Sequence, residues 1–456
     1  MFRRFARSFI LIFGLLACAD AARAASAPPD FQQAKTPSGL VYWHGLQKDE
    51  TEQVIHFGWR DGVIAAMPGK EGLTRLGPSQ MFAGTQAISD GEYYERINDL
   101  HATASLSANS ETTRGIIRAP RDRLGEVAGL VSESFASPRL SETTIARLRT
   151  RFADQAREAE VKPNAIAYQA ALTAILGDHF QTRSGRPRSF EAVTRGDIED
   201  WRKAVFSRDD LIIVTSGPLG PEEMGPLIDR AFAPLPQTGA HKKTPPAALN
   251  VSARTIVVER DVPQTILLLI GRTGIVPEAG SAKALLGNQI LGASTDSRLL
   301  NAIRQGLGAA YGISSGTFSV NAAQNLLVIS TPVSHDRAKA ALETIRATYA
   351  AWQEKGVTDA EFQPARARLV NAIQSGERQS GSAAGGLLTL LLDGLGADVF
   401  RTREERIKGF SLADINAAIG EKFDRPPLMT IAVTPDAALI GADCVVKTAE
   451  EAAACR

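Results

Sequence analysis

Apolar residues recur along most of this chain at intervals of three and four positions, the spacing that marks one buried face of a helix. This pattern predicts helices at residues 72–83, 93–100, 124–136, 142–158, 165–176, 197–206, 282–291, 337–354, 359–374 and 387–395. Short apolar or alternating runs predict strands at 39–43, 54–60, 211–216, 265–271 and 326–331, with two more between 102 and 117. Such a mixture of helices and strands predicts an α+β fold.

A helix-then-strand segment near residue 200 occurs a second time, 217 residues later. The matching residues share one offset (414 − 197 = 217) without a gap: Asp197, Ile198, Phe206, Arg208 and Leu211 with Asp414, Ile415, Phe423, Arg425 and Leu428. Five matches in register indicate an internal duplication. Each half is then expected to be an α/β sandwich, with its helices on one face of a mainly antiparallel sheet.

The stretch 235–246 separates the two repeats, because it combines Pro, Gly and Lys and has no periodicity. At 456 residues the chain is also too long for one ordinary core. We therefore expect a first half at 32–238, a linker at 239–249, a second half at 250–440 and a C-terminal tail at 441–456.

The N-terminus has the pattern of a signal peptide. Arg3, Arg4 and Arg7 precede an apolar run at 9–19, and small residues for cleavage follow at 22–24. We expect residues 1–24 to be removed and the mature protein to be periplasmic or secreted. Lipidation of Cys18 in a lipoprotein signal is the alternative.

Composition narrows the classes of partner. With 44% hydrophobic and 22% charged residues, the chain has the balance of a globular protein. A formal net charge of +1 gives no reason to expect nucleic acid or an anionic membrane as a partner. Beyond the N-terminus no apolar run is long enough to span a bilayer. Cys444 and Cys455 form a disulfide or remain as two free thiols on a frayed tail.

The stretch 291–316 contains a candidate binding pair. Leu299 and Ile303 lie at helical spacing, and residues 309–315 then alternate like a strand. This arrangement sets Arg304, on the last helical turn, close to Tyr311. A guanidinium and a phenol held together can donate hydrogen bonds to a peptide carbonyl. In the structural alternative, Arg304 complements its helix C-terminus and Tyr311 lines the core.

This stretch resembles the C-terminal-half signature of the pitrilysin/insulinase family of zinc peptidases. The similarity rests on a small-residue loop, Ser297-Arg298-Leu299, Ile303-Arg304 and then Gly308 to Tyr311. In that family an Arg and a Tyr seven residues later bind the substrate backbone beside the zinc. The resemblance therefore implies that Arg304 and Tyr311 bind substrate.

The family's zinc motif, H-x-x-E-H, has lost every functional residue here. Gly72-Leu73 before it and Phe82 to Thr85 after it locate the motif at residues 75–79. Arg75 and Ser79 stand in place of the two His, and Pro78 stands in place of the catalytic Glu. The third ligand of the family falls near Gln155. The six histidines form no pair at ligand spacing, so we expect no metal and no catalytic residue in this chain.

The resemblance also implies a function, because the family includes two-chain enzymes in which one subunit has lost the zinc motif. This chain then resembles the non-catalytic, substrate-binding subunit of an exported heterodimeric zinc endopeptidase, with the zinc in a catalytic partner of the same family and a peptide as substrate. The alternative is a homodimeric peptide-binding module or scaffold without proteolysis. Hydrolysis at another site is the weakest hypothesis, because no G-x-S-x-G or phosphate-binding loop occurs.

Overall fold

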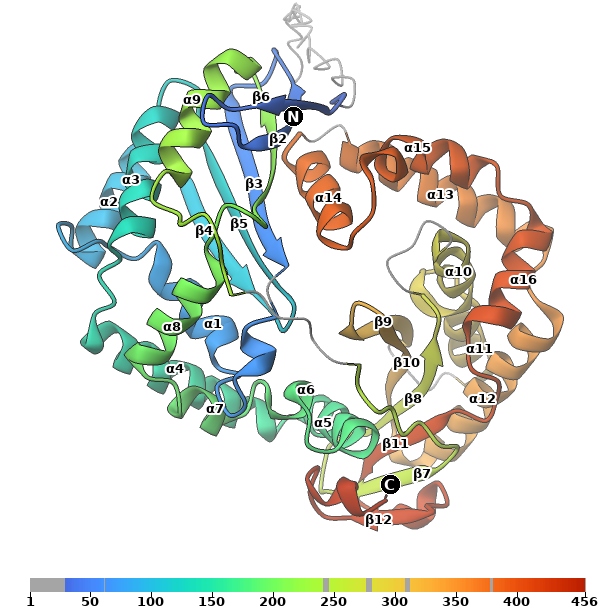
Figure 1. The fold of residues 1–456 in the computed structure, drawn as a ribbon. Coiled ribbons are helices and arrows are strands. Elements are labelled where there is room, and N and C mark those ends of the chain that lie inside the picture. The colour runs from blue at the N-terminus through green and yellow to red at the C-terminus, as the bar shows by residue number, and fades with distance from the viewer. Residues whose placement is uncertain are drawn as a thin grey trace, which may run out of the picture.

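The computed structural model describes residues 29–60, 62–240, 246–275, 281–307, 312–377 and 380–455. Within this part of the chain two halves are visible, each built on a six-stranded sheet. Figure 1 shows the first half in blue and green on the left and the second half in yellow to red on the right.

The first sheet is mainly antiparallel, with one parallel pair between β2 and β6. In spatial order its strands are β1 (Gln32–Lys35), β2 (Val41–Leu46), β6 (Ile212–Gly217), β3 (Glu52–Arg60), β5 (Thr112–Pro120) and β4 (Thr103–Ala108). The central strand β3 is buried along most of its length, with Ile55, Phe57 and Trp59 inaccessible to solvent.

The second sheet repeats this order. Its strands are β12 (Cys444–Val446), β7 (Thr255–Glu259), β11 (Met429–Thr434), β8 (Thr265–Thr273), β10 (Gln324–Val333) and β9 (Ser314–Asn321). The two sheets differ in their first edge strand, which is the N-terminal β1 in one half and the C-terminal β12 in the other. The expected pair of duplicated α/β halves is confirmed.

Most helices predicted from periodicity are also confirmed. Those of the first half are α1 (Leu73–Met81), α2 (Asp90–Asp99), α3 (Leu124–Ala136), α4 (Glu142–Glu160), α5 (Pro163–Leu176), α6 (Phe180–Arg183), α7 (Pro187–Glu191), α8 (Arg195–Val205) and α9 (Pro221–Phe232). Those of the second half are α10 (Ser281–Asn288), α11 (Arg298–Leu307), α12 (Ala338–Lys355), α13 (Asp359–Glu377), α14 (Ser380–Leu392), α15 (Ala397–Lys408) and α16 (Leu412–Lys422).

The two copies of the repeated segment begin in the same way. Thr194 and Asp197 form a capping box at the start of α8, and Ser411 and Asp414 form one at the start of α16. In each copy the cap hydroxyl accepts a hydrogen bond from the Asp backbone N–H, and the Asp carboxylate accepts one from the backbone N–H of the cap residue. A lysine from another segment also pairs with each Asp, at 2.8 Å for Asp197 and 2.6 Å for Asp414. The offset found in the sequence thus joins equivalent positions in space.

Each sheet is covered on its second face by a helix from the other half. Helix α14 of the second half packs on the first sheet, where Leu387 and Leu388 meet Val214 and Phe31. Helix α5 of the first half packs on the second sheet, whose inner residues include Leu268. Figure 1 shows α14 beside β3 and β6, and α5 beside β11. From the sequence we expected helices on one face of each sheet only. The exchanged helices α5 and α14 cover the second face.

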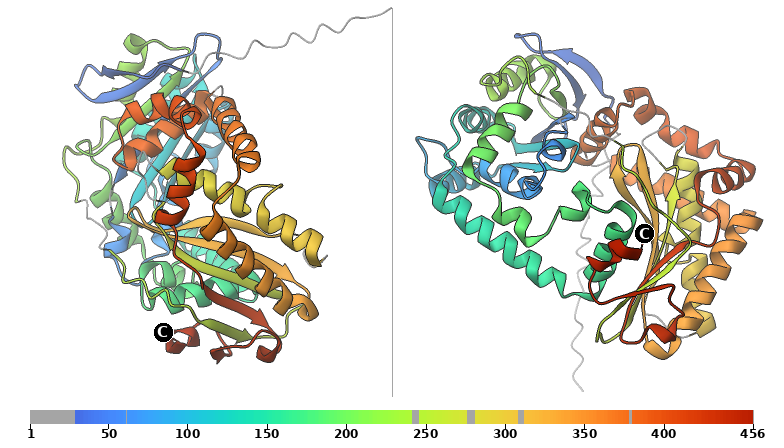
Figure 2. Two further views of the ribbon diagram at one scale, coloured as in Figure 1. Left: turned by 90° about the vertical axis from the view of Figure 1, so that its right-hand side faces the viewer. Right: turned by 60° about the horizontal axis from the view of Figure 1, so that its bottom comes forward.

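The C-terminal segment holds α5 in place from outside. Strand β12 joins the edge of the second sheet beside β7, and a short 3-10 helix, η5 (Glu451–Cys455), packs on α5. Cys444 and Cys455 are joined by a disulfide, with their Cα atoms 6.0 Å apart. Glu450 also pairs with Arg186 of the first half. The right-hand view of Figure 2 shows this segment next to α5.

Some local predictions were wrong. The helix expected at 282–291 ends at Asn288 and continues as a π-helix, η2 (Gln289–Ala293). The strand expected at 309–315 starts only at Ser314 as β9, and residues 308–311 lie outside the described part. Strands β1, β7 and β12 and helices α6, α7, α9 and α15 were not predicted. No single described helix has the length and apolarity of a membrane span; α14 and α15 meet the test only as a pair bent by 110°.

We predict that Leu387→Ala lowers the free energy of unfolding by roughly 2–5 kcal/mol, because it leaves a cavity beneath a fully buried side chain. Because α14 covers the first sheet, amide hydrogen exchange should become faster in β3 and β6, although Leu387 belongs to the second half of the sequence. Val161→Ala, at a side chain 75% exposed, is the control and should change stability by less than about 0.5 kcal/mol. Faster exchange confined to the second sheet would contradict the exchange of helices.

Candidate functional site

Helix α1 carries the three positions predicted to correspond to the zinc motif, of which Arg75 is exposed, Ser79 is partly exposed and Pro78 is buried. Its buried residues, Leu73, Leu76 and Gly77, fix the helix on the core of the first half. A Cβ atom at Gly77 would come within 2.8 Å of the Trp201 ring, so this close contact needs glycine. Arg75 and Ser79, one helical turn apart, are left outside the core.

The polar groups at this position bind one another. The Arg75 Nη2 donates a hydrogen bond of 2.9 Å to the Gln155 side-chain oxygen on α4, and its guanidinium lies 4.0 Å from the centre of the Phe152 ring. The Ser79 hydroxyl donates to the Leu76 carbonyl of its own helix, at 2.9 Å. Gln155, which is close to the expected position of the third zinc ligand, is therefore in direct contact with Arg75, which is at the expected position of the first.

These residues do not fit a zinc ion. A guanidinium is permanently charged and has no free electron pair, and Pro78 has no acidic group to activate water. Within the described ranges no group of three or more His, Cys, Asp or Glu side chains is placed to hold a metal. The arrangement can join α1 to α4, but its residue types offer no metal-dependent chemistry.

Helix α11 presents Arg304 on its exposed side. Leu299 and Ile303 are 0% and 1% exposed and face the core of the second half, as their spacing predicted, whereas Arg304 is exposed. Tyr311 lies outside the described residues, so the geometry of the predicted pair is not described.

Two ion pairs fix the start of α11 to α13. Arg298 donates from Nε and Nη2 to the two carboxylate oxygens of Glu361, at 2.5 and 2.7 Å. The bond to Arg298 lowers the pKa of Glu361 to about 2, so this carboxylate stays ionised at neutral pH. Arg368, two turns further along α13, donates to Asp296 at 2.9 Å. Sequence reasoning missed both pairs; the only signal was their spacing on one face of a predicted helix.

The small residues before α11 have a packing role. A Cβ atom at Gly292 would lie 2.7 Å from the Ser315 hydroxyl oxygen and 2.8 Å from a Leu299 methyl group. Ser315 in turn donates to the Asn288 side-chain oxygen at 2.6 Å. This glycine lets η2 approach β9, which brings α11 to its place beside the sheet.

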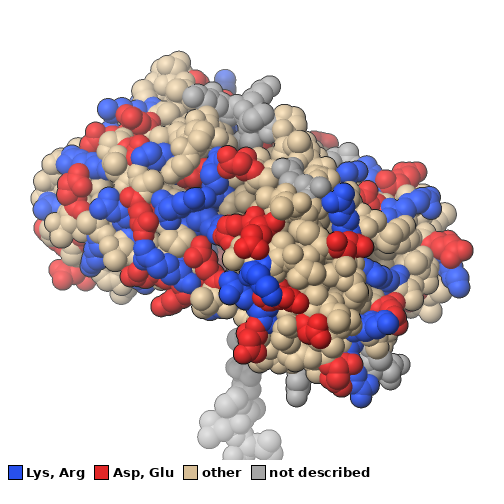
Figure 3. Space-filling view, turned by 90° about the horizontal axis from the view of Figure 1, so that it is seen from below, with Lys and Arg blue, Asp and Glu red and all other residues tan. Residues whose placement is uncertain are grey.

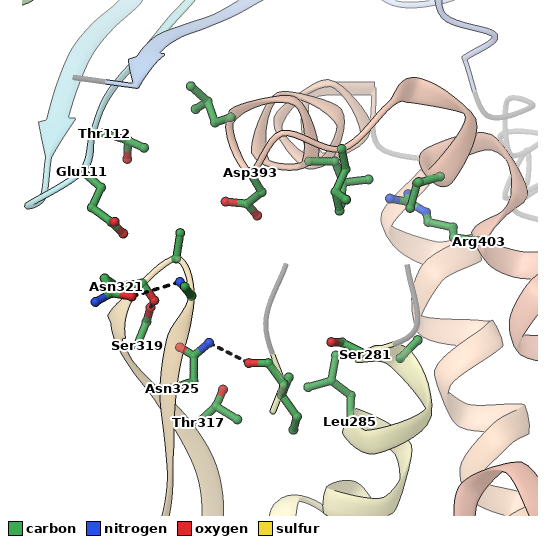
Figure 4. Close-up of a pocket in the computed structure, with 18 of the residues that line it drawn as sticks. Glu111, Thr112, Ser281, Leu285, Thr317, Ser319, Asn321, Asn325, Asp393 and Arg403 are labelled. Atoms are coloured by element: carbon green, nitrogen blue, oxygen red, sulfur yellow. Dashed lines mark hydrogen bonds between the residues drawn. The ribbon is translucent and has the colours of Figure 1, made fainter. Parts of the chain in front are cut away.

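A central cavity of about 1190 Å³ opens between the two halves. One wall consists of the β4–β5 turn and the β9–β10 hairpin, which contribute mostly polar side chains. The other consists of α10, α13 and α15 and the end of α14, which contribute mostly apolar ones. Figure 4 shows Glu111, Ser319 and Asn321 on the first wall, and Leu285 on the other side. Sequence reasoning did not find this cavity, because its walls come from segments that are far apart in the chain.

Two carboxylates in the cavity have unusual electrostatics. Burial raises the pKa of Asp393, and the charges of Arg114 and Arg60 partly offset this effect. Burial also raises the pKa of Glu111; a hydrogen bond from the Ala322 backbone opposes the rise, and the charge of Asp393 adds to it. Arginine charges therefore oppose the pKa rise of Asp393, and a backbone hydrogen bond opposes that of Glu111.

Charged side chains of the outer surface are mixed in sign on the face seen in Figure 3. Acidic and basic side chains are interspersed there, and no large area of one sign is visible. This distribution agrees with the low net charge of the sequence.

Comparison with known proteins relates part of this chain to a family model and its fold to solved structures. Residues 192–369 match the family model described as "Peptidase M16 inactive domain". The fold is similar to a peptidase M16 inactive domain from Pseudomonas fluorescens, with a TM-score of 0.80, 17% identity, and coverage of 89% of this chain and 98% of that one. A protease from Helicobacter pylori gives 0.78 at 17% identity, covering 90% and 100%.

The periplasmic protease PqqL from Escherichia coli has a TM-score of 0.75 at 14% identity, covering 91% of this chain and 48% of that one. No curated protein sequence matches the chain. At these identities the solved structures establish the shared fold, and the family model establishes the relationship of residues 192–369. Together they support the resemblance of this chain to non-catalytic members of the peptidase M16 family.

We predict that restoring the motif will create a metal site at α1. The variant R75H/P78E/S79H/Q155E supplies two imidazoles and two carboxylates at the family's positions, and should bind about one zinc per chain. Metal analysis after dialysis measures this, with R75H/P78E/S79H as the control that lacks the third ligand and should hold zinc more weakly. The unaltered chain should retain none. One tightly bound zinc in the unaltered chain would refute the assignment of the degenerate motif.

Proposed function

Because residues 192–369 belong to the peptidase M16 inactive domain family, we propose that this chain is a non-catalytic, substrate-binding subunit of an exported heterodimeric zinc endopeptidase. The partner is a catalytic subunit of the same family, which carries the zinc ion and the acid–base residue. This chain contributes Arg304 and Tyr311 to the partner's cleft, where they bind the peptide substrate.

The observation that carries this proposal is the contrast between α1 and α11. At α1 the polar groups are satisfied by one another, since Arg75 bonds to Gln155 and Ser79 bonds to its own helix. At α11 the guanidinium of Arg304 is exposed, although the helix beneath it is fixed by buried leucine and isoleucine side chains and two ion pairs. A rigid, exposed donor is suited to a ligand that arrives from outside the chain.

The chemical task of such a donor follows from its charge. A peptide carbonyl oxygen gains negative charge when its carbon is attacked, so a charged donor aimed at it binds the transition state more strongly than the substrate. Arg304 can stabilise the transition state in this way without a metal ion bound to this chain. The reaction centre is then divided between two chains.

Export is part of the proposal. It is supported by the three arginines and the apolar run at the N-terminus, although residues 1–28 lie outside the described part. The Cys444–Cys455 disulfide supports it as well, because disulfides persist in oxidising compartments such as the periplasm.

The central cavity favours a second candidate function. A cavity of about 1190 Å³ within one chain could hold a peptide without any catalytic partner. The chain would then be a homodimeric peptide-binding module or scaffold. Co-expression with the adjacent reading frame, followed by size-exclusion chromatography, distinguishes the two: a stable complex with a chain that carries H-x-x-E-H supports the heterodimer, and a homodimer supports the module.

We predict that Arg304→Ala and Tyr311→Phe each lower turnover of the reconstituted complex by about ten- to a thousand-fold. Removing a donor to a developing oxyanion costs roughly 2–4 kcal/mol, at about 1.36 kcal/mol per factor of ten. Steady-state kinetics on the complex measures the effect. Arg401→Ala, at another exposed arginine of the second half, is the matched control and should leave turnover unchanged.

Melting temperatures decide between binding and packing roles for this pair. Tyr311→Phe keeps the ring, so the chain should stay folded and should associate with its partner as before. If turnover per folded complex stays the same while the melting temperature falls, Arg304 and Tyr311 are structural residues, and this assignment is wrong.

A further inference from the structure

The contact that holds α14 on the first sheet is apolar in its middle and polar at both ends. Leucine side chains supply the apolar part. Near the end of the helix, Arg114 of β5 donates from Nη1 to the Thr389 hydroxyl at 3.0 Å. Near its start, Nε2 of His56 on β3 lies 2.9 Å from the Gly381 carbonyl oxygen. This bond joins residues 325 positions apart and therefore links the two halves directly.

Small residues at the start of α14 allow this close contact. A Cβ atom at Gly385 would lie 3.1 Å from the His56 ring, and one at Gly381 would lie 2.7 Å from Nη2 of Arg118. His56 and Arg118 therefore lie under the same part of the helix, and a side chain at Gly385 would crowd the ring.

The bond to Gly381 fixes the protonation pattern of the His56 ring. A carbonyl oxygen only accepts hydrogen bonds, so Nε2 carries the hydrogen and Nδ1 carries the free electron pair. Burial lowers the pKa of His56; the hydrogen bond to Gly381 opposes this fall, and the charge of Arg118 adds to it. The ring is therefore neutral at neutral pH, and a proton taken up at Nδ1 would place a second cation beside Arg118.

The other charges around His56 are mostly positive. Alternate residues of a strand share a face, so the charged residues that β3 and β5 present on the side of His56 are Glu52, Arg60, Arg114 and Arg118. The one carboxylate among them, Glu52, is bonded to Arg118 at 3.0 Å. Strand β6 and residues 381–392 of α14 contain no titratable side chain. Asp393 follows the end of α14, and Arg403 of α15 approaches this helix at Gly386.

We propose that His56 is a pH-sensitive latch between the two halves, which holds the start of α14 on the first sheet while the ring is neutral and releases it when the ring is protonated. In the released state the ring is in water, away from Arg118. Because α14 leads into the wall of the central cavity at Leu390 and Leu392, its movement also changes the shape of the cavity. The inference goes beyond the proposed function, since the latch needs neither a partner subunit nor a bound peptide.

The direction of the pH dependence follows from the lowered pKa of the docked state. A histidine in water has a pKa of about 6.5. Between this value and the lower pKa of docked His56, the released state binds a proton that the docked state does not, so docking weakens as the pH falls below about 6.5. Over this range the released population grows by up to about ten-fold per pH unit. Above pH 7 the ring is neutral in both states, and this population stays constant.

Amide hydrogen exchange of the purified chain at pH 7.5 and pH 5.5 tests the latch, after correction for the intrinsic pH dependence of exchange. Opening of α14 and β3 should increase about three- to ten-fold at pH 5.5. His56→Gln keeps an N–H donor for Gly381 but cannot take up a proton, so the increase should fall below about two-fold. His101→Gln, at an exposed histidine in the turn after α2, is the matched control and should respond like the unaltered chain.

A second variant tests the role of the neighbouring charge without altering the histidine. Arg118→Gln removes the cation beside the ring and leaves Glu52, so docked His56 should be easier to protonate and the increase in opening at pH 5.5 should be smaller. NMR titration of the histidine ring protons gives the pKa of His56 directly. This pKa should lie below 6.5 in the unaltered chain and should rise in Arg118→Gln.

Three results would overturn the proposal. The first is equal corrected exchange of α14 and β3 at the two pH values in the unaltered chain. The second is an undiminished pH response in folded His56→Gln, which would assign the response to another group such as Asp393. The third, which decides the matter even if His56→Gln does not fold, is a His56 ring that titrates at or above pH 6.5.

Discussion

The structure depends on the exchange of α5 and α14 between its two halves. Each sheet has a face that its own half leaves uncovered, and the helix that buries this face comes from the other half. Separating the halves would expose both apolar sheet faces to water. The free-energy cost of this exposure is the main term that opposes separation. The C-terminal segment strengthens this arrangement, because it packs over α5 and is closed by a disulfide.

This constraint also sets the positions of the candidate sites. The central cavity exists because two sheets and an exchanged helix meet around it, so it cannot be attributed to either half alone. The base of α11 belongs to the second half and is fixed by its contacts with α13. Arg304 and the side chains that line the cavity are therefore carried by elements packed within the fold.

Local structure could be predicted from the sequence, because periodicity and capping act over a few residues. Helices such as α4 and α8 have a polar face and an apolar face, and the pattern shows which is buried. The exchange was not predicted, although a signal was present: α5 and α14 have apolar residues all round and lack a continuous polar face. Such helices are buried on more than one side, but the sequence does not say against which sheet.

The candidate sites were predictable to different degrees, because local signals can be recognised in the sequence and contacts between distant segments cannot. The predicted motif positions on α1 could be assigned because the residues used to locate them, Gly72-Leu73 before and Phe82 to Thr85 after, are close to them in the sequence. Glu111, in contrast, reads from the sequence as one more polar residue in a turn. Its environment is created by Asp393, which follows it by 282 positions (393 − 111 = 282) and reaches the cavity only through the exchange of α14.

The contact of Arg75 with Gln155 connects α1 to α4 through residues of types that do not bind metal. A hydrogen bond from Arg75 to Gln155 and the packing of the guanidinium on Phe152 join helices α1 and α4. The charged group at this position is a guanidinium, and the neutral amide of Gln155 and the aromatic face of Phe152 suit it. The connection between the helices therefore survives, and the groups still available to a ligand are those on α11 and in the central cavity.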